Sequence, residues 1–232
     1  MHRFFIADEA LNSKNIAINN ARVCHQIKTV LRFAPGEQIS IFNKNGKEAI
    51  ITLTAVSSRQ CQGTLIKTLQ NKEVRPSILV YCSILKRENF ELVAQKITEC
   101  GAHALIPIIA DRTIKSKIKK ERVSLIMQEA AEQCGRKDIP ALYDTVLFTD
   151  ALSHIAKKKE TIIFFDAQGL PLKNAPLKFP VHLFIGPEGG WTTQEKQHAQ
   201  QCGAQSISLG ENVFRAETAA IVGTYEILRN KD

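Results

Sequence analysis

Two glycine-containing segments near the end of the chain have the residue types that hold a small ligand. Residues 186–190 read Gly-Pro-Glu-Gly-Gly, and residues 209–218 read Leu-Gly-Glu-Asn-Val-Phe-Arg-Ala-Glu-Thr. Glycine allows a tight turn and a close approach of the backbone to a ligand. The first segment lacks the Gly-x-Gly-x-x-Gly of dinucleotide sites and the Gly-Lys-Ser/Thr of phosphate loops. The pattern therefore favours a ligand held by backbone groups and apolar walls, such as an adenosine without phosphates. A tight connection alone would also explain the first segment.

Three charged side chains in these segments could act on a bound substrate. Glu188 and Glu217 are candidate general bases, and Arg215 is a candidate cation. The two glutamates also have structural alternatives. Glu188 can stabilise its own loop, and Glu217 falls in the first turn of an expected helix, where the dipole favours a carboxylate. Arg215 lies between apolar Phe214 and that helix start, near the expected pocket.

The elements that must position these segments alternate in type after residue 76. Apolar runs predict strands and amphipathic patterns predict helices. The expected strands are residues 78–85, 104–110, 161–165, 181–185 and 205–209, and the expected helices are residues 89–100, 121–134, 193–201 and 217–228. Such alternation predicts a mostly parallel sheet covered on both faces. Ligands bind beyond the carboxyl ends of the strands in such sheets. Residues 166–169, 186–191 and 210–215 are expected to form the loops at that edge.

Three residues beside the first segment have structural interpretations. Thr192 and Glu195 have the spacing of a capping box, so Glu195 is expected to cap the helix that follows. Trp191 is expected in the core or at an interface rather than as a stacking platform. Glu188 and Glu217 therefore remain the candidate bases.

The first 70 residues show a different pattern, typical of β structure. Residues 37–42 and 48–53 resemble a hairpin with a turn at residues 43–46, and residues 62–67 supply a further strand. Residues 21–33 look helical, and Pro35-Gly36 stops that helix. Short strands with close turns predict a small barrel. The polar segment at residues 71–76 is the expected domain boundary.

Positive charge is concentrated at the start of the chain. Of a formal charge of +8, residues 1–73 hold 10 Lys and Arg against 5 Asp and Glu, a net +5; the remainder holds 21 against 18, a net +3. A basic excess suits a polyanionic partner. Residues 112–122 are densely basic as well. They could contact phosphates, or they could form a solvated loop and helix start.

Composition and spacing argue against several classes of protein. A content of 44% hydrophobic and 23% charged residues is ordinary for a globular chain of 232 residues. No apolar run approaches the roughly 20 residues of a membrane helix. The chain turns acidic too soon for a secretion signal, so a cytosolic location is expected. The six cysteines are spread singly, without a Cys-x-x-Cys pair, so we expect neither a metal site nor a disulfide framework.

Together with several other motifs, these segments resemble the RsmE-type 16S ribosomal RNA methyltransferases of the knotted SPOUT superfamily. The resemblance covers nearly the whole chain. It is carried by Arg3-Phe4-Phe5, His25, Val30-Leu31-Arg32, Lys86, Gln95-Lys96, Glu99, Gly101, Gln128-Glu129-Ala130, Glu132-Gln133-Cys134, Arg136, Pro140 and residues 185–192, 208–210 and 214–219. One departure lies at residues 212–214, Asn-Val-Phe, where the family commonly has a basic residue followed by Ile-Leu. It affects one pocket wall and one contact to RNA or cofactor.

The resemblance implies a fold, a cofactor and partners. The fold is α/β: residues 1–72 form a PUA-like β-barrel that binds RNA, and residues 73–232 form a SPOUT domain with a deep trefoil knot. The chain is implied to act in the cytoplasm as a homodimer, with its pocket near the subunit interface. The methyl donor is S-adenosylmethionine, and the target is N3 of a uridine in the 16S RNA of the 30S subunit.

The resemblance also names site residues. The implied donor site comprises Phe165, Ile185, Gly186, Pro187, Glu188, Gly189, Gly190, Leu209, Gly210, Val213, Phe214, Arg215 and Thr218. The implied RNA contacts are Arg3, His25, Lys28, Arg32, Lys86 and Arg136. Each of these charges could equally be solvated, and His25 could be a packed or capping histidine.

Methyl transfer to uracil N3 makes demands that these residues can meet. The reaction is an in-line displacement at a sulfonium methyl, so positioning carries much of the work and no metal is required. The N3 proton must leave, which calls for Glu217 or Glu188 as base or for Arg215 as a cation beside the anionic uracil. Because N3 lies on the Watson–Crick edge, the target must be unpaired or flipped out.

Three alternatives stay open on the sequence. The chain could be another SPOUT enzyme that methylates transfer RNA or a ribose hydroxyl. It could be a catalytically silent RNA-binding or ribosome-assembly protein. A nucleotide-phosphate enzyme would require ATP binding, which the missing phosphate loop argues against.

Overall fold

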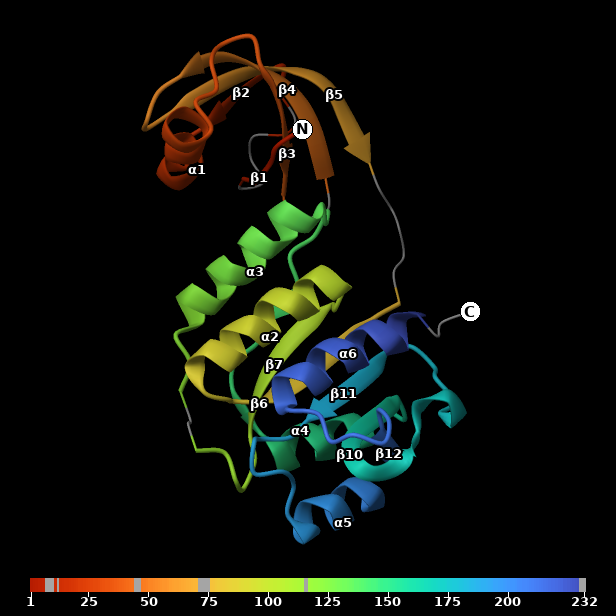
Figure 1. The fold of residues 1–232 in the computed structure, drawn as a ribbon. Coiled ribbons are helices and arrows are strands. Elements are labelled where there is room, and N and C mark those ends of the chain that lie inside the picture. The colour runs from red at the N-terminus through yellow and green to blue at the C-terminus, as the bar shows by residue number, and fades with distance from the viewer. Residues whose placement is uncertain (7–10, 12, 44–46, 71–75, 115–116, 230–232) are drawn as a thin grey trace. The chain divides into compact units, whose positions relative to one another are not determined.

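The computed structural model describes residues 1–6, 11, 13–43, 47–70, 76–114 and 117–229 (Figure 1). The chain divides into two compact units, Met1–Val74 with Ala131–Ile139, and Arg75–Ala130 with Pro140–Asp232. Most of the expected turn at residues 43–46 and of the expected boundary at residues 71–76 lies outside the described residues.

A curved five-stranded sheet forms most of the first unit. Its strands are β1 (Arg3–Phe5), β2 (Asn15–Ile18), β3 (Gln38–Phe42), β4 (Lys47–Val56) and β5 (Cys61–Gln70), in the order β1-β3-β4-β5-β2. Strands β1 and β3 are parallel, and the other neighbours are antiparallel. The predicted hairpin and further strand are confirmed as β3, β4 and β5. The short strands β1 and β2 were not predicted.

A short helix packs into the core of this unit. Helix α1 (Ala21–His25) is capped by Asn20, whose side-chain oxygen accepts hydrogen bonds from the Arg22 and Val23 N–H groups. It continues as the π-helical turn η2 (Gln26–Val30), so the helix ends before the predicted residue 33. The core is made of buried aliphatic, aromatic and cysteine side chains, namely Phe4, Ile6, Leu11, Ile16, Ile18, Val23, Cys24, Ile27, Ile39, Ile41, Ala49, Ile51, Leu53 and Cys61.

Residues 131–139 belong to the first unit although they come much later in the chain. The Glu132 carboxylate accepts hydrogen bonds from the Phe5 N–H at 3.0 Å and from the Arg22 guanidinium at 3.3 Å. Arg3 donates to the Arg136 carbonyl at 2.8 Å. These bonds explain why the segment groups with the N-terminal sheet.

An all-parallel sheet of seven strands forms the centre of the second unit, as the alternating pattern predicted. Its strands are β6 (Ile78–Ser83), β7 (Ala104–Ile109), β8 (Ala141–Leu142), β9 (Val146–Leu147), β10 (Thr161–Pro171), β11 (Val181–Ile185) and β12 (Gln205–Ser208). The order is β12-β10-β11-β6-β7-β8, and β9 also pairs with β7. Val181 lies between Thr161 and Ile78 in the register.

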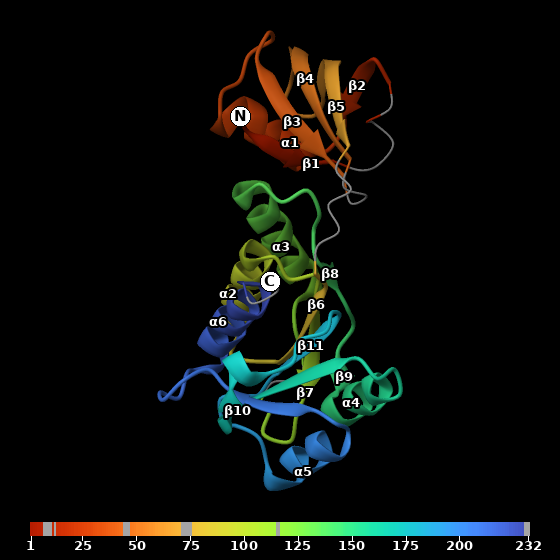
Figure 2. The ribbon, with the colours of Figure 1, turned by 90° about the vertical axis from the view of Figure 1, so that its right-hand side faces the viewer.

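Helices cover both faces of this sheet (Figure 2). Helices α2 (Arg87–Cys100) and α6 (Ala216–Arg229) pack together on one face, and α4 (Phe148–Ala156) and α5 (Thr193–Gln201) lie on the other. The remaining elements are α3 (Lys120–Cys134) and the 3-10 turn η3 (Leu172–Asn174). Helix α2 ends as predicted, with Gly101 in the left-handed conformation. Helix α4 was not predicted, and its N-terminus has no side-chain cap.

Residues 166–169 correct one prediction. They were expected as a loop after a strand, but β10 runs on to Pro171. The register with β12 breaks here, because both Phe165 and Leu170 lie opposite Ile207. The intervening residues therefore form a bulge inside the strand rather than a separate loop.

Candidate active site

The carboxyl ends of β12, β10 and β11 lie side by side, and the two glycine-containing segments leave the sheet there. Residues 186–190 follow β11, and residues 209–215 follow β12. Helix α6 then crosses back over β6 and β11. It lies so close to β10 that a Cβ on Gly223 would come within 2.0 Å of the Phe165 ring. One edge of the sheet therefore brings both predicted segments together with Phe165.

The buried Trp191 side chain holds the segment 186–190 against the end of β10. Its ring is 7% exposed, stacks on Phe164 with 4.6 Å between centroids, and donates from Nε1 to the Phe165 carbonyl at 2.9 Å. A Cβ on Gly186 would lie 2.8 Å from the indole, so only glycine fits there without a shift. The core position predicted for Trp191 is confirmed. The indole also joins the loop after β11 to the end of β10.

The end of the same segment is held by a helix cap. Thr192 and Glu195 form the predicted capping box of α5, with each side chain bonded to the backbone of the other. The second oxygen of the Glu195 carboxylate accepts from the Asp111 N–H at 2.9 Å. Arg112 donates to the Gly189 carbonyl at 2.7 Å. The loop is thus tied to the segment after β7 as well as to α5.

Glu188 is exposed and takes part in a backbone contact. Its Oε1 accepts a hydrogen bond from the Lys86 N–H at 3.0 Å, at the start of α2. This bond satisfies one of the unpaired N–H groups at a helix N-terminus. The sequence left two roles open for Glu188, a catalytic base and a stabiliser of its loop. The bond to Lys86 fits the second role.

Glu217 has the opposite environment. It lies in the first turn of α6, is 8% exposed, and its Oε2 has no hydrogen-bond partner among the described residues. A buried carboxylate oxygen without a partner is costly, so such an atom points to a missing contact. Burial raises the pKa of the Cys82 thiol, and the charges of Glu188 and Glu217 raise it further. Both carboxylates therefore lie near the end of β6.

A small cavity lies between the bulge of β10 and the loop after β12. Its lining combines apolar side chains with a few polar ones, namely Phe165, Asp166, Ala167, Ile207, Ser208, Leu209, Asn212, Val213 and Phe214. Four predicted donor-site residues, Phe165, Leu209, Val213 and Phe214, are thus brought together. The volume of about 70 Å³ is below the roughly 300–1,000 Å³ of a small-molecule pocket. The lining does not include residues 185–190.

The loop 209–215 is mostly exposed. Val213 is 80% exposed and Phe214 is 38% exposed. Gly210 has a φ of 146°, a conformation that favours glycine. Arg215 is exposed, and its carbonyl accepts from Ala219 at 2.8 Å as α6 begins. Thr218 follows within the first turn of that helix.

Two kinds of feature are absent from the part of the chain that the structure describes. No group of three or more His, Cys, Asp or Glu residues there could hold a metal ion. In the same ranges, no helix has the length and apolar character needed to cross a membrane.

The family is decided by comparison with known proteins. A family model described as an RNA methyltransferase domain matches residues 72–226, and one described as an RNA methyltransferase PUA domain matches residues 18–66. The chain belongs to this RNA methyltransferase family. The PUA-like character predicted for the N-terminal sheet and the α/β fold are confirmed with it.

Relatives within the family match almost end to end. The chain is 28% identical to the ribosomal RNA small subunit methyltransferase E of Bacillus subtilis over 240 residues, which is 95% of this chain and 93% of that protein. It is 28% identical to the enzyme of that name from Synechocystis, over 97% of this chain and 77% of the relative. The RsmE-type resemblance is therefore confirmed.

Two solved structures carry the same fold. The methyltransferase E of Neisseria gonorrhoeae, bound to S-adenosylmethionine, superposes with a TM-score of 0.90 at 25% identity and covers 99% of this chain and 97% of that one. A Legionella pneumophila protein in complex with S-adenosylmethionine gives 0.88 at 29% identity, over 98% and 96% of the two chains.

The six RNA-contact candidates of this methyltransferase fall into two groups. His25, Lys28 and Arg32 are exposed in the first unit, and Lys86 is exposed in the second, so these four are accessible to a nucleic acid. The other two are held by protein contacts. Their role in RNA binding stays a prediction.

Arg3 and Arg136 make contacts within the first unit. Arg3 pairs with Glu48 at 3.0 Å, donates to the Arg136 carbonyl and lies 4.9 Å from the centroid of the Phe42 ring. Arg136 is 4% exposed, and its guanidinium bonds Asp138 at 2.6 Å. The Arg136 guanidinium is buried against its partner, whereas Arg3 is half-buried and its Nη2 has no hydrogen-bond partner among the described residues.

Sequence reasoning placed residues 166–169 at this edge but gave no role to several residues of the site. Asp166 and Ala167 line the cavity, and Arg112 holds the Gly189 carbonyl. The position of Arg112 at the head of the basic segment was the one available signal. The positions of Asp166 and Ala167 in the lining depend on the bulge in β10, which no local sequence pattern predicts.

Proposed function

We propose that this methyltransferase uses S-adenosylmethionine to methylate N3 of a uridine in the 16S RNA of the small ribosomal subunit. The observation that carries the proposal is the nearly full-length match to proteins named ribosomal RNA small subunit methyltransferase E, one of them solved with the donor bound. Nothing specific in the site favours transfer RNA, a ribose hydroxyl or a silent assembly role.

The residues at the sheet edge suit this donor. The apolar side chains Phe165, Ile207 and Leu209 can cover an adenine face, and the backbone at Gly190 is open to approach. The partnerless Oε2 of Glu217 provides a buried acceptor that a bound molecule can complete. When bound, the donor supplies an electrophilic methyl on a sulfonium.

The environments of the two glutamates support Glu217 as the base. Glu217 is buried and has a free oxygen, so we assign to it the removal of the uracil N3 proton. Glu188 accepts from Lys86, so we assign to it the positioning of the loop. Arg215 is exposed beside Glu217 in the chain and can stabilise the anionic uracil. The Glu217 carboxylate would accept the N3 proton; the bound donor would supply the methyl to the N3 lone pair as its S–CH3 bond breaks, and would leave as a neutral thioether.

Further parts of the proposal concern assembly and location. We assign RNA binding to the barrel of residues 1–72, with His25, Lys28 and Arg32 on its surface, and methyl transfer to residues 73–232, with Lys86 as a further RNA contact. We also propose a deep trefoil knot in the second unit, a homodimer and a cytoplasmic location on 30S particles. Exposed Val213 and Phe214 beside an incomplete cavity support the dimer, because a second chain could cover them.

The proposed reaction is tested with donor carrying a labelled methyl group. The protein is incubated with 30S particles, free 16S RNA or transfer RNA, and the product is digested to nucleosides. We expect label in N3-methyluridine from the small-subunit RNA. Label confined to transfer RNA, or to a ribose, would replace this target. Absence of donor binding by calorimetry would indicate a silent RNA-binding protein.

A further inference from the structure

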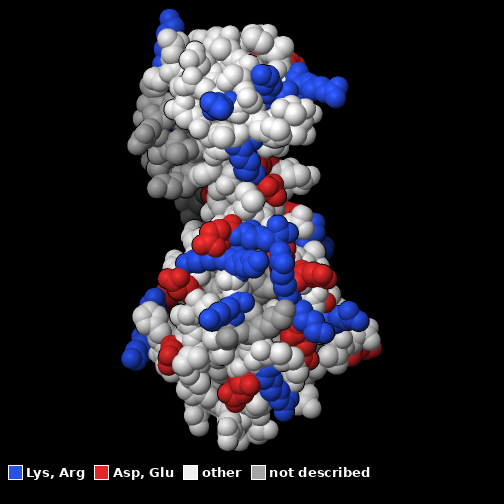
Figure 3. Space-filling view, turned by 90° about the vertical axis from the view of Figure 1, so that its left-hand side faces the viewer, with Lys and Arg blue, Asp and Glu red and all other residues white. Residues whose placement is uncertain are grey.

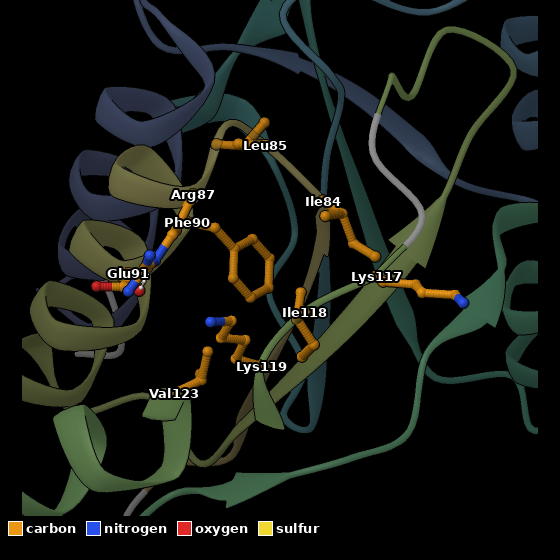
Figure 4. A pocket seen from close by; sticks show the side chains of 9 residues that line it. All are labelled: Ile84, Leu85, Arg87, Phe90, Glu91, Lys117, Ile118, Lys119 and Val123. Carbon is orange, nitrogen blue, oxygen red and sulfur yellow. Dashed lines mark hydrogen bonds and ion pairs between the residues drawn. The ribbon is translucent and has the colours of Figure 1, made fainter. Parts of the chain in front are cut away.

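A second cavity, of about 160 Å³, lies in the α/β unit between the start of α2 and residues 117–123. Its walls are apolar: Ile84, Leu85 and Phe90 line one side, and Ile118 and Val123 line the other. Figure 4 shows the Phe90 ring pointing into the cavity towards Ile118. A space of a few water volumes suits one planar group and is too small for a drug-sized ligand.

Cations flank this cavity on both sides. Lys119 extends towards Arg87 and Glu91, and Lys117 extends to the opposite side (Figure 4). Neither lysine forms an ion pair with any residue that the structure describes. Arg122 and Arg87 both pair with Glu91 and lower its pKa. The negative charge of the one carboxylate in the lining is therefore balanced by two guanidinium groups. Figure 3 shows Lys and Arg side chains gathered over this side of the unit.

The side of the cavity formed by the start of α2 is tied to the loop 186–190. Lys86, directly before the lining residue Arg87, donates its N–H to Glu188 at 3.0 Å. Arg112, which does not line the cavity, also donates to the Gly189 carbonyl at 2.7 Å. The cavity therefore adjoins the proposed donor loop. None of residues 209–218, which belong to the proposed reaction site, lines it.

We propose that this cavity binds an unpaired nucleotide that flanks the target uridine, an inference that rests on the proposed function. The base enters the apolar space beside Phe90, and the phosphates on its two sides meet Lys117 and Lys119. An apolar cavity with a cation on each side matches a nucleotide inside a strand, which has a phosphate on each side of its base. The flanking nucleotide positions the RNA so that the target reaches the donor.

Binding of a fluorescein-labelled single-stranded octauridine tests this site on the full chain. The lysine pair is changed in K117E/K119E, and the cavity is filled in Ile118→Trp. We expect each variant to bind at least about tenfold more weakly than the wild type. For the lysine variant, the slope of log K against log salt should fall by about 1.4, because each phosphate contact to a single strand contributes about 0.7.

A matched control separates this site from general charge. Lys157→Glu/Lys158→Glu makes the same charge change at exposed positions after α4, and we expect its effect on octauridine binding to be less than twofold. Thermal unfolding checks that Ile118→Trp folds; if it does not, the exposed lysine pair still decides. Wild-type affinity in K117E/K119E, equal weakening in the control, or no binding by the wild type would overturn the site.

The outcome is distinguishable from failure of the proposed function. Donor binding and methyl transfer to 30S particles are measured on the same proteins. If the wild type transfers no methyl but the lysine variant still loses octauridine binding, the cavity remains an RNA site and the proposed reaction fails. If methyl transfer is normal and all variants bind octauridine equally, the cavity proposal fails alone.

Discussion

The two segments that frame the proposed donor site differ in how firmly the protein holds them. Residues 186–190 are fixed by the Trp191 indole below, by Lys86 and Arg112 at the side, and by the capping box after them. Residues 209–215 have an exposed Val213 and Phe214 and border a cavity of about 70 Å³. Residues 186–190 therefore form a preformed wall of the proposed site, and residues 209–215 form an open wall.

This difference divides the work of the site. The preformed wall can set the position of the donor at no ordering cost during binding, which is how pre-organisation gains affinity. The open wall can move over the donor, or meet a second chain, and thereby complete a pocket of sufficient volume. Glu217 lies just beyond the open wall and is buried, so the proposed base is delivered by the rigid helix α6.

The largest expected effect separates the two glutamates. Glu217→Gln should lower the turnover of methyl transfer by about 10²- to 10⁴-fold, because a general base is lost; glutamine keeps an acceptor oxygen, so donor binding should change little. Glu188→Gln is the matched change on the preformed wall and should have a much smaller effect. Turnover is followed with labelled donor and 30S particles. The reverse order of the two variants would move the base to Glu188.

The next effect tests the rigidity of the preformed wall. Gly186→Val places side-chain atoms in the Trp191 ring, since even a Cβ would lie 2.8 Å from it. Overpacking of this kind costs about 1–3 kcal/mol of unfolding free energy, measured by urea titration. Combining it with Trp191→Leu should give less than the sum of the two losses, because the clash is removed. Strict additivity would show that the loop can yield.

A smaller effect tests the open wall. Val213→Ser and Phe214→Ala should leave the unfolding free energy within about 0.5 kcal/mol of the wild type, as for other exposed positions. Both should still weaken donor binding several-fold in calorimetry, because these side chains line the cavity. A large loss of stability would mean that the loop is packed in solution.

The smallest effect concerns the strand beneath the two carboxylates. Cys82 is fully buried, and burial, together with the charges of Glu188 and Glu217, raises the pKa of its thiol. The thiolate is the reactive form, so an alkylating reagent at pH 8 should label the exposed Cys134 and spare Cys82. Equal labelling, read by mass spectrometry, would show that this edge of the sheet opens readily.

Local patterns were sufficient for most of the second unit. Helix α2 follows from an apolar stripe that ends at Gly101, and α5 follows from the capping pair Thr192 and Glu195. Helix α4 lacks a side-chain cap at its start, so nothing marked where it begins. The bulge of β10 depends on pairing with Ile207, which is not visible within residues 166–169.

The site could be predicted in part, for the same reason. The glycines and the strand order placed both segments at one edge of the sheet. Whether a charged side chain is free or committed depends on partners distant in the chain. Arg3 meets Glu48, and Glu188 meets Lys86 across 102 positions. Residue type alone could therefore not separate these from the exposed Lys28 and the partnerless Glu217.

The most direct test of the donor site is a crystal structure of this chain with S-adenosylmethionine. We predict that the donor lies between residues 186–190 and residues 209–218, with the backbone of the first segment unchanged and that of the second moved over the ligand. A donor bound elsewhere, or a rearranged loop at residues 186–190 beside an unmoved loop at residues 209–215, would contradict the account.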